Sequence, residues 1–178
     1  MQIEFWTRPR GIPRQPGAYV LAIELSRPIT LALAIRPSAT LAAGCYLYCG
    51  SAKGPGGLQA RIARHMRRGK PIRWHIDNLT EVGCVLGAWT IVEGHECQLV
   101  AALSHLPMPI EGFGSSDCLG CKTHLVRWPG KSMALLHRGL GSVLSKPGHS
   151  VDASKVRRRA QVVRFKSNGL DVGQVTRC

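Results

Sequence analysis

Acidic residues are scarce in this sequence. Its 178 residues contain 10 Asp and Glu against 24 Lys and Arg, which gives a formal net charge of +14 and a pI near 10.2. This balance is far from that of a typical soluble enzyme and indicates a polyanionic partner, chiefly nucleic acid and more weakly an anionic membrane surface. A basic protein with a merely solvated surface is the alternative, because net charge says nothing about fold.

Long hydrophobic runs are also missing. Arg36 and Pro37 interrupt the most apolar segment, so no run approaches the roughly 20 apolar residues that a membrane-spanning helix needs. Residues 1–10 include Glu4 and Pro9 and lack an apolar stretch, so we expect no secretory signal. The seven cysteines are odd in number and scattered, which argues against a disulfide scaffold. We therefore expect a cytoplasmic protein that does not insert into membranes.

The chain is long enough for one domain, and its hydrophobic content of 44% is ample for a single core. We expect an irregular N-terminal arm over residues 1–15 and a folded domain over residues 16–129. Residues 130–178 carry ten Lys and Arg and two Asp, which is +8 of the net charge. We expect this basic tail to be disordered or to fold only on a partner.

Alternation of strand-forming and helix-periodic segments predicts an α+β fold. Strands are predicted at Gly17–Leu25, Thr30–Arg36, Cys45–Gly50 and Cys84–Val92, with weaker candidates at Ile110–Phe113 and His124–Trp128. The first two should form a hairpin, since only a short polar turn separates them. Helices are predicted at Gly57–Arg68, Ile72–Val82 and His95–Leu106.

The most basic part of the folded domain runs from Tyr46 to Arg73 as a strand, a glycine-rich loop and a helix. This stretch contains no Asp or Glu, so a nucleic-acid backbone is its natural ligand. The candidate phosphate-binding residues are Lys53, Arg61, Arg64, Arg67, Arg68, Lys70 and Arg73. Arg61 and His65 are four residues apart, so they share one helix face beside the apolar stripe, where they could bind phosphate and move a proton. The alternative is an ordinary surface Arg beside a half-buried His.

Glu96 begins the inward face of the third predicted helix, in a domain with few acids. A buried carboxylate must be paired, hydrogen-bonded or bound to a metal, and Mg²⁺ is typically held by one or two carboxylates plus substrate phosphate and water. Alternatively, Glu96 caps its own helix. Tyr19 and Tyr48 lie on strands that we expect to be neighbours; they could act in catalysis if a cation lowered the phenol pKa, or simply pack.

Cys118 and Cys121 resemble half of a zinc site, which Cys97, His95 or His124 could complete. One Cys-x-x-Cys without a second at the right spacing is a weak signal, so we do not expect zinc. A redox pair and a structured loop that carries thiols are the alternatives.

Four separated phrases now fall into one order: Gly17-Ala18-Tyr19, Tyr48-Cys49-Gly50, Arg61-x-x-x-His65 and Glu96. With WHIDNL, HEC and GFGSSDC followed by THL, they resemble the GIY-YIG nuclease superfamily over residues 16–128. Within it, the chain is similar to the GIY-YIG-like domain of archaea and bacteria that was long of unknown function and is sometimes fused to endonuclease III. Ala18 and Cys49 replace the isoleucines of the superfamily name.

The resemblance implies a small antiparallel sheet with a three-stranded core flanked by helices, and one divalent ion, Mg²⁺ or Mn²⁺. It implies that Tyr19 and Tyr48 flank the scissile phosphate, that Arg61 and His65 stabilise it, and that Glu96 ligates the metal. We have no residue for the late asparagine of many members; Ser116, Asp117 and His124 are the candidates to replace it.

The expected function is therefore a metal-dependent DNA endonuclease that hydrolyses phosphodiester bonds. DNA repair or recombination, together with a protein partner, is its expected setting. A nucleic-acid-binding module of the same fold without catalysis is one alternative, and a zinc-containing interaction protein is another. The sequence does not decide between DNA and RNA, and it leaves the oligomeric state open.

Overall fold

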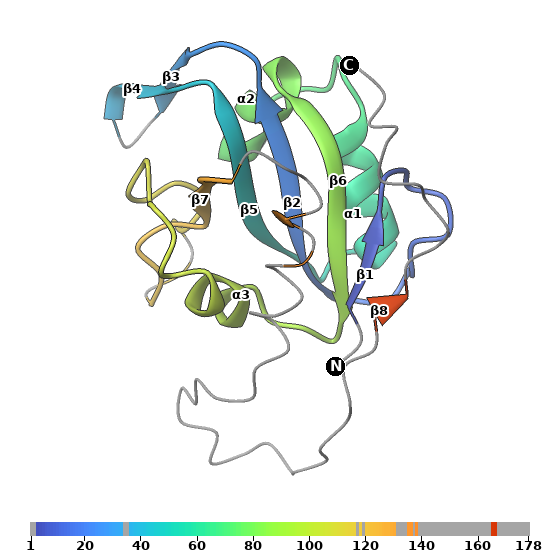
Figure 1. Ribbon diagram of the computed structural model, residues 1–178. Helices are drawn as coiled ribbons and strands as arrows, with labels where there is room; N and C mark the ends of the chain where they lie inside the picture. Colours follow the sequence, from blue (N-terminus) through green and yellow to red (C-terminus); the bar gives the residue numbers. More distant parts are fainter. Residues whose placement is uncertain are drawn as a thin grey trace.

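A computed structural model describes residues 3–33, 36–116, 118, 120–130, 135–136, 138 and 165–166, with the backbone alone at 32, 33, 36, 37, 165 and 166. The fold is α+β, as the sequence predicts (Figure 1). Five antiparallel strands lie in the order β7 (Leu125–Trp128), β5 (Gly44–Ala52), β2 (Gly17–Leu25), β6 (Cys84–Val92) and β1 (Ile3–Trp6). The two-residue β8 (Phe165–Lys166) pairs with β1 in parallel.

β2 is the centre of the sheet, with β5 on one side and β6 on the other. Its residues are buried apart from Glu24. Burial on both faces explains why the sequence of β2 is nearly continuously apolar and does not alternate between apolar and polar residues. The observed bounds of β2 and β6 are those predicted from the sequence. The predicted three-stranded core corresponds to β5, β2 and β6, but the sheet is wider than expected, because β7 and β1 extend it.

Three local predictions were wrong. The N-terminal arm contains β1, which pairs with β6. The predicted strand Thr30–Arg36 is two short strands, β3 (Ile29–Leu33) and β4 (Arg36–Leu41), which pair with each other in a separate hairpin and not with β2. Residues 110–113 form turns and no strand. Each error concerns whether a short segment pairs with another strand, and with which one. Short-range sequence patterns carry little information about strand pairing.

The helices cover both faces of the sheet (Figure 1). α1 (Gly57–Met66) and α2 (His75–Val82) pack on the face that carries Leu21 and Ile23, while α3 (Glu96–Ala102) packs on the face that carries Val20 and Ala22. Because successive strand residues point to opposite faces, β2 supplies both cores at once. α3 ends four residues before its predicted end, since the chain turns after Ala102.

α2 begins three residues later than predicted because of Asp77. The Oδ2 atom of this buried carboxylate accepts hydrogen bonds from the backbone N–H groups of Arg73 and Trp74, at 2.9 and 3.0 Å. These bonds satisfy donors at the helix N-terminus and fix where the helix starts. Asp77 thereby holds Arg73 and Trp74, at the end of the loop between α1 and α2, at the start of α2.

Among the described residues, no helix combines the length and the hydrophobicity that crossing a bilayer would require. The prediction of a disordered tail falls almost wholly on residues outside the described ranges. Leu136, which belongs to that segment, is buried against the α3 side of the core.

Candidate active site

The register between β2 and β5 places the two candidate tyrosines on one face of the sheet. Tyr19 lies opposite Gly50, and Leu21 lies opposite Tyr48. Tyr19 and Leu21 are two residues apart, so Tyr19 and Tyr48 share the face that α1 and α2 cover. Gly50 is required here because the Tyr19 ring lies directly over it, where any Cβ would overlap the ring.

Tyr48 is held by a glycine from a different part of the chain. Gly114 has a φ of +70°, which favours glycine, and a Cβ there would come within 2.7 Å of the Tyr48 ring. The Gly114 N–H donates to Nδ1 of His75 at 3.1 Å, which ties this loop to the start of α2. Burial raises the pKa of the Tyr48 hydroxyl above its ordinary value, so the phenol is neutral.

Tyr19 and His65 form a buried pair at the centre of the site. The Tyr19 hydroxyl and His65 Nε2 are 2.7 Å apart. Burial raises the pKa of Tyr19 and lowers that of His65 to about 3, so both groups are neutral. His65 Nδ1 lies 3.9 Å from Oδ1 of Asp77, which favours a proton on Nδ1. In that tautomer Tyr19 donates its hydroxyl proton to Nε2, and its oxygen lone pairs stay free to accept.

Arg61 extends from α1 beside this pair. Its guanidinium stacks on the Trp74 ring, 4.1 Å from the centroid. Stacking occupies the flat face of the guanidinium and leaves its N–H edge available for a planar or tetrahedral oxyanion. Arg64 lies over the same ring at 4.3 Å, but it is engaged elsewhere: its guanidinium donates to Asp77 Oδ1 at 2.7 Å and to the Pro71 carbonyl at 2.9 Å.

Glu96 is the first residue of α3, and its side chain is partly buried. The Oε2 atom is buried and has no hydrogen-bond partner among the described residues. Without such a partner, Oε2 does not satisfy the helix amides as the capping alternative would require. A buried carboxylate oxygen without a donor is suited to a hard cation.

These groups converge on one cavity of about 320 Å³. All five predicted catalytic residues line it, although they come from β2, β5, α1 and α3. The remaining lining residues are Gly50, Ser51, Arg73, Trp74, His75, Ile76, Gly114, Ser116, Cys118 and His124. Of the candidates to replace the late asparagine, Ser116 and His124 reach the cavity, and Asp117 lies outside the described residues.

Sequence reasoning missed the part that His75 and Gly114 play. Neither is among the predicted site residues. Their contact joins residues 39 apart in the chain. The single available signal was that both belong to the phrases WHIDNL and GFGSSDC, which carry the family resemblance.

Apart from Arg61, the six proposed nucleic-acid-binding cations fall into two groups. Lys53, Arg67 and Arg73 are exposed, and Arg73 also lines the cavity. The side chains of Arg64, Arg68 and Lys70 donate hydrogen bonds to other parts of the protein: Arg68, although exposed, donates to the carbonyls of Glu81 and Gly83, and the Lys70 ammonium donates to Glu81 Oε1 at 2.8 Å.

The basic stretch itself contains no acid, but acids that follow it in the chain neutralise part of its charge. Asp77 and Glu81, which follow it in the chain, pair with Arg64 and Lys70. These contacts hold the pKa of both carboxyls below their ordinary values, to about 2 for Glu81, mainly through the Lys70 hydrogen bond. Lys53, Arg67 and Arg73 remain as candidates for phosphate contacts, because the side chains of Arg64, Arg68 and Lys70 already donate within the protein.

Cys118 and His124 line the cavity, and Cys121 and Cys97 from α3 lie close to them. The sequence could not decide which of Cys97, His95 and His124 join Cys118 and Cys121 in a candidate metal site. That choice depends on how α3 packs against the loop before β7. The structure groups Cys97 and His124, and not His95, with the two loop cysteines.

Comparison with protein families matches residues 18–141 to a family model described as a domain of unknown function, DUF123. This range covers more than half of the chain and contains every residue of the cavity. The comparisons with curated proteins and with solved structures found no match.

Proposed function

The chain belongs to the DUF123 family, and we propose that this member is a divalent-metal-dependent endonuclease of the GIY-YIG type that hydrolyses phosphodiester bonds in DNA. The observation that carries the proposal is the convergence of three groups on one cavity: a carboxylate oxygen without a hydrogen bond among the described residues, a stacked guanidinium and a tyrosine–histidine pair. A reaction that attacks one anionic phosphate needs these types of group: a metal ligand, a cation and a proton acceptor.

The cavity fits a single hard divalent ion. Glu96 is the one carboxylate among the lining residues, and its Oε2 atom lacks a hydrogen bond among the described residues. Mg²⁺ and Mn²⁺ accept such a ligand together with water and substrate phosphate. A bound ion supplies Lewis-acid polarisation of the phosphate and lowers the pKa of water.

The protein groups have distinct tasks in this proposal. The N–H edge of Arg61 binds a non-bridging oxygen and stabilises the charge that develops on the phosphate. The Tyr19 oxygen accepts a hydrogen bond from the attacking water, and in the tautomer with the proton on Nδ1 the Tyr19 hydroxyl donates its own proton to His65 Nε2. When water loses a proton to Tyr19, the Tyr19 proton moves to His65. An anionic phosphate beside His65 raises the imidazole pKa from about 3 and makes this transfer more favourable.

A binding module without catalysis is the second candidate. It is favoured by one observation: burial raises the pKa of both tyrosines and lowers that of His65, so none of these three side chains is a strong base without substrate. Such a module would bind nucleic acid with a steep salt dependence and never turn it over.

A cleavage assay with Glu96→Gln separates the two. Labelled single-stranded, duplex and branched DNA, and an RNA strand, are incubated with Mg²⁺ or Mn²⁺. The native chain should cleave at least one DNA, and Glu96→Gln should lower the rate on the order of 100-fold or more while binding is retained. Glu111→Gln is the matched control, since Glu111 is exposed and outside the cavity. Cleavage that survives in Glu96→Gln contradicts the assignment; binding without turnover in the native chain favours the module.

A further inference from the structure

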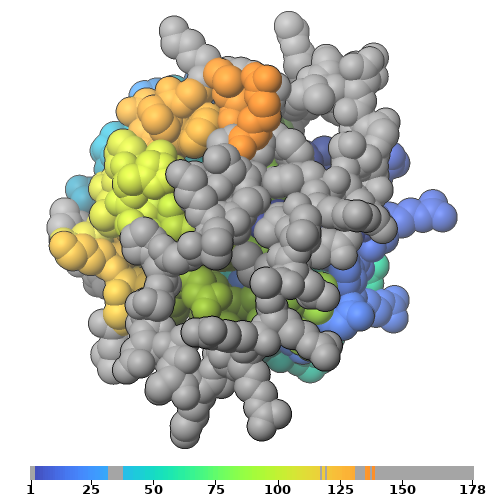
Figure 2. Space-filling model, turned by 60° about the horizontal axis from the view of Figure 1, so that its bottom comes forward, coloured from blue at the N-terminus to red at the C-terminus, as the bar shows by residue number. Residues whose placement is uncertain are grey.

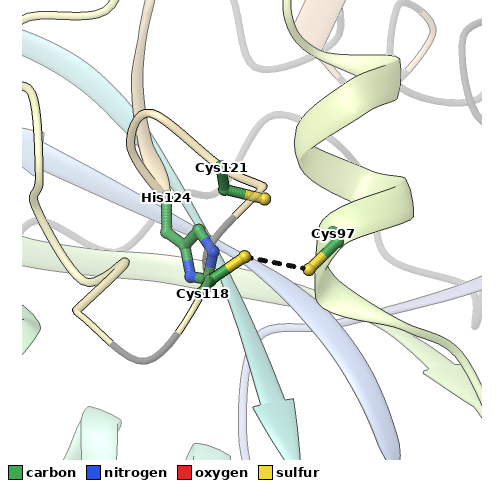
Figure 3. Close-up of side chains that lie close together, drawn as sticks. All are labelled: Cys97, Cys118, Cys121 and His124. Carbon is green, nitrogen blue, oxygen red and sulfur yellow. Dashed lines mark hydrogen bonds between the residues drawn. The ribbon is translucent and has the colours of Figure 1, made fainter.

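Three thiols and one imidazole come together beside the cavity. The ligand atoms of Cys97, Cys118, Cys121 and His124 all lie within 4.8 Å of one another. Figure 3 shows the three sulfur atoms turned toward a common point, with Cys97 on α3 and the other three residues in the loop before β7. The Sγ atoms of Cys97 and Cys118 are 3.4 Å apart.

This donor set is that of a structural zinc site. Zn²⁺ prefers thiolate and imidazole ligands in a tetrahedron, and Zn–S and Zn–N bonds of about 2.3 and 2.0 Å place ligand atoms roughly 3.5 to 3.8 Å apart. The observed cluster needs only small side-chain movements to reach that geometry. His124 Nε2 is buried and has no hydrogen-bond partner among the described residues, so an imidazole nitrogen is available.

We propose that Cys97, Cys118, Cys121 and His124 bind one structural zinc ion, which joins the start of α3 to the loop before β7 and positions Glu96. Four protein ligands fill a tetrahedral coordination sphere, which is the mark of a structural site and not of a catalytic one. The ion differs from the divalent ion proposed at Glu96, because thiolates select zinc whereas a carboxylate with phosphate and water suits Mg²⁺.

At this position a bound ion would stabilise the start of α3 and the loop before β7. Glu96 and Cys97 are adjacent in the first turn of a seven-residue helix that has no side-chain cap. The loop residues lead into β7, which is only four residues long. Short elements of this kind contribute few contacts of their own, and structural zinc commonly supplies the missing stability in such regions. A fixed Cys97 also fixes the backbone from which the Glu96 carboxylate enters the cavity.

Other contacts in this region point the same way. The Arg127 N–H in β7 donates to the Pro107 carbonyl after α3 at 2.8 Å, and the His124 carbonyl accepts from the Cys49 N–H at 2.9 Å. In Figure 2 the yellow-green segment that contains α3 lies beside the orange segment that contains β7. The cluster lies where these two segments meet, so one ion there would lock them together.

Metal analysis of the full chain tests this directly. The protein is purified under reducing conditions, passed through buffer cleared of free metal, and analysed for zinc. We expect about one zinc per chain, and a clear loss in Cys121→Ser. Cys45→Ser is the matched control, because Cys45 is a free, partly buried cysteine outside the cluster, and it should keep its zinc.

A second measurement avoids reliance on a variant that fails to fold. Zinc is removed from the native chain with a chelator and replaced by Co²⁺, which should give the charge-transfer and tetrahedral d–d absorption of a thiolate-rich site. The midpoint of thermal unfolding should fall on removal and recover on addition of Zn²⁺.

Three results would overturn the proposal. The native protein could contain no zinc, or a disulfide could join cluster cysteines after reducing purification. Equal zinc content in Cys121→Ser and the native chain would indicate an adventitious ion only. Since none of these readouts involves DNA, the proposal stands or falls independently of the nuclease.

Discussion

The Tyr19 hydroxyl and His65 Nε2 lie 2.7 Å apart in a setting that keeps both groups neutral. Tyr19→Phe removes the oxygen that we propose to accept the water proton, while the ring stays over Gly50. The rate of cleavage should fall on the order of 100-fold or more, as for loss of a general acid–base group. Unfolding in urea should show a loss of about 1–3 kcal/mol, because His65 Nε2 is left buried without a partner.

Tyr46→Phe is the control for that change. Tyr46 is a buried residue of the same strand as Tyr48, outside the cavity, and its hydroxyl donates to the Ala42 carbonyl at 2.7 Å. Its loss should lower stability by about 0.5–1.5 kcal/mol and leave the cleavage rate unchanged. Equal rates in Tyr19→Phe and Tyr46→Phe would show that the Tyr19 oxygen has no part in the reaction.

Individual site residues were predictable from the sequence to an uneven degree. Tyr19, Arg61 and Glu96 could be selected because they stand in recognisable phrases and in chemically unusual positions, such as a carboxylate on an apolar face. The sequence could not show that Arg61 and Arg64 have different contacts, although both lie on α1. This difference depends on Asp77, which binds Arg64 from 13 residues further along the chain only once α2 has packed against α1.

The β2–β5 pair is the element on which the cavity depends, and Gly50 is its most sensitive position. In Gly50→Ala the new Cβ would overlap the Tyr19 ring, which must then move away from His65. Such overpacking costs about 1–3 kcal/mol. We expect this loss in urea unfolding, together with a cleavage rate that falls at least as far as in Tyr19→Phe.

Gly54→Ala is the matched control for this substitution. A Cβ on Gly54 would meet nothing within 4 Å, and this glycine does not have a positive φ. The change should be neutral or stabilise the protein by up to about 1 kcal/mol, through a less flexible unfolded chain. A Gly50→Ala protein as stable as Gly54→Ala would mean that Tyr19 does not pack as described.

At the level of strands and helices, local pattern was sufficient where burial is continuous. β2 and β6 could be delimited because each is an apolar run bounded by turn residues. The four-residue β1 was missed, since so short a segment carries no period and depends on β6 for its hydrogen bonds. The partner of β3 was wrong because pairing is decided between segments and not within one.

The distribution of charge over the whole chain yields a further prediction. Residues 130–178 carry +8 of the net charge, and Lys155, Arg157, Arg158 and Arg159 form its densest run. Substituting these four by Gln should weaken DNA binding to a similar degree for all sequences. The slope of log K against log salt should become shallower by about 0.9 for each cation that contacts a phosphate. Fluorescence anisotropy of labelled DNA at several salt concentrations measures this slope.

The same variant should cut DNA at unchanged positions, because electrostatic contacts of this kind carry no sequence information. A shifted cleavage position would show that the tail guides the substrate into the cavity. Arg68→Gln is a useful comparison: its guanidinium is bound to two carbonyls, so its loss should lower stability and leave the salt slope unchanged.

The order in which the cavity residues occur along the chain has a consequence for synthesis of the protein. A ribosome delivers Tyr19, Tyr48, Arg61 and His65 first, and Glu96, Gly114 and His124 only later. β5 also stays without its outer neighbour until β7 has been made. A growing chain can thus display its arginines to nucleic acid well before the proposed metal ligand emerges. Unfinished chains on polysomes would bind without cutting.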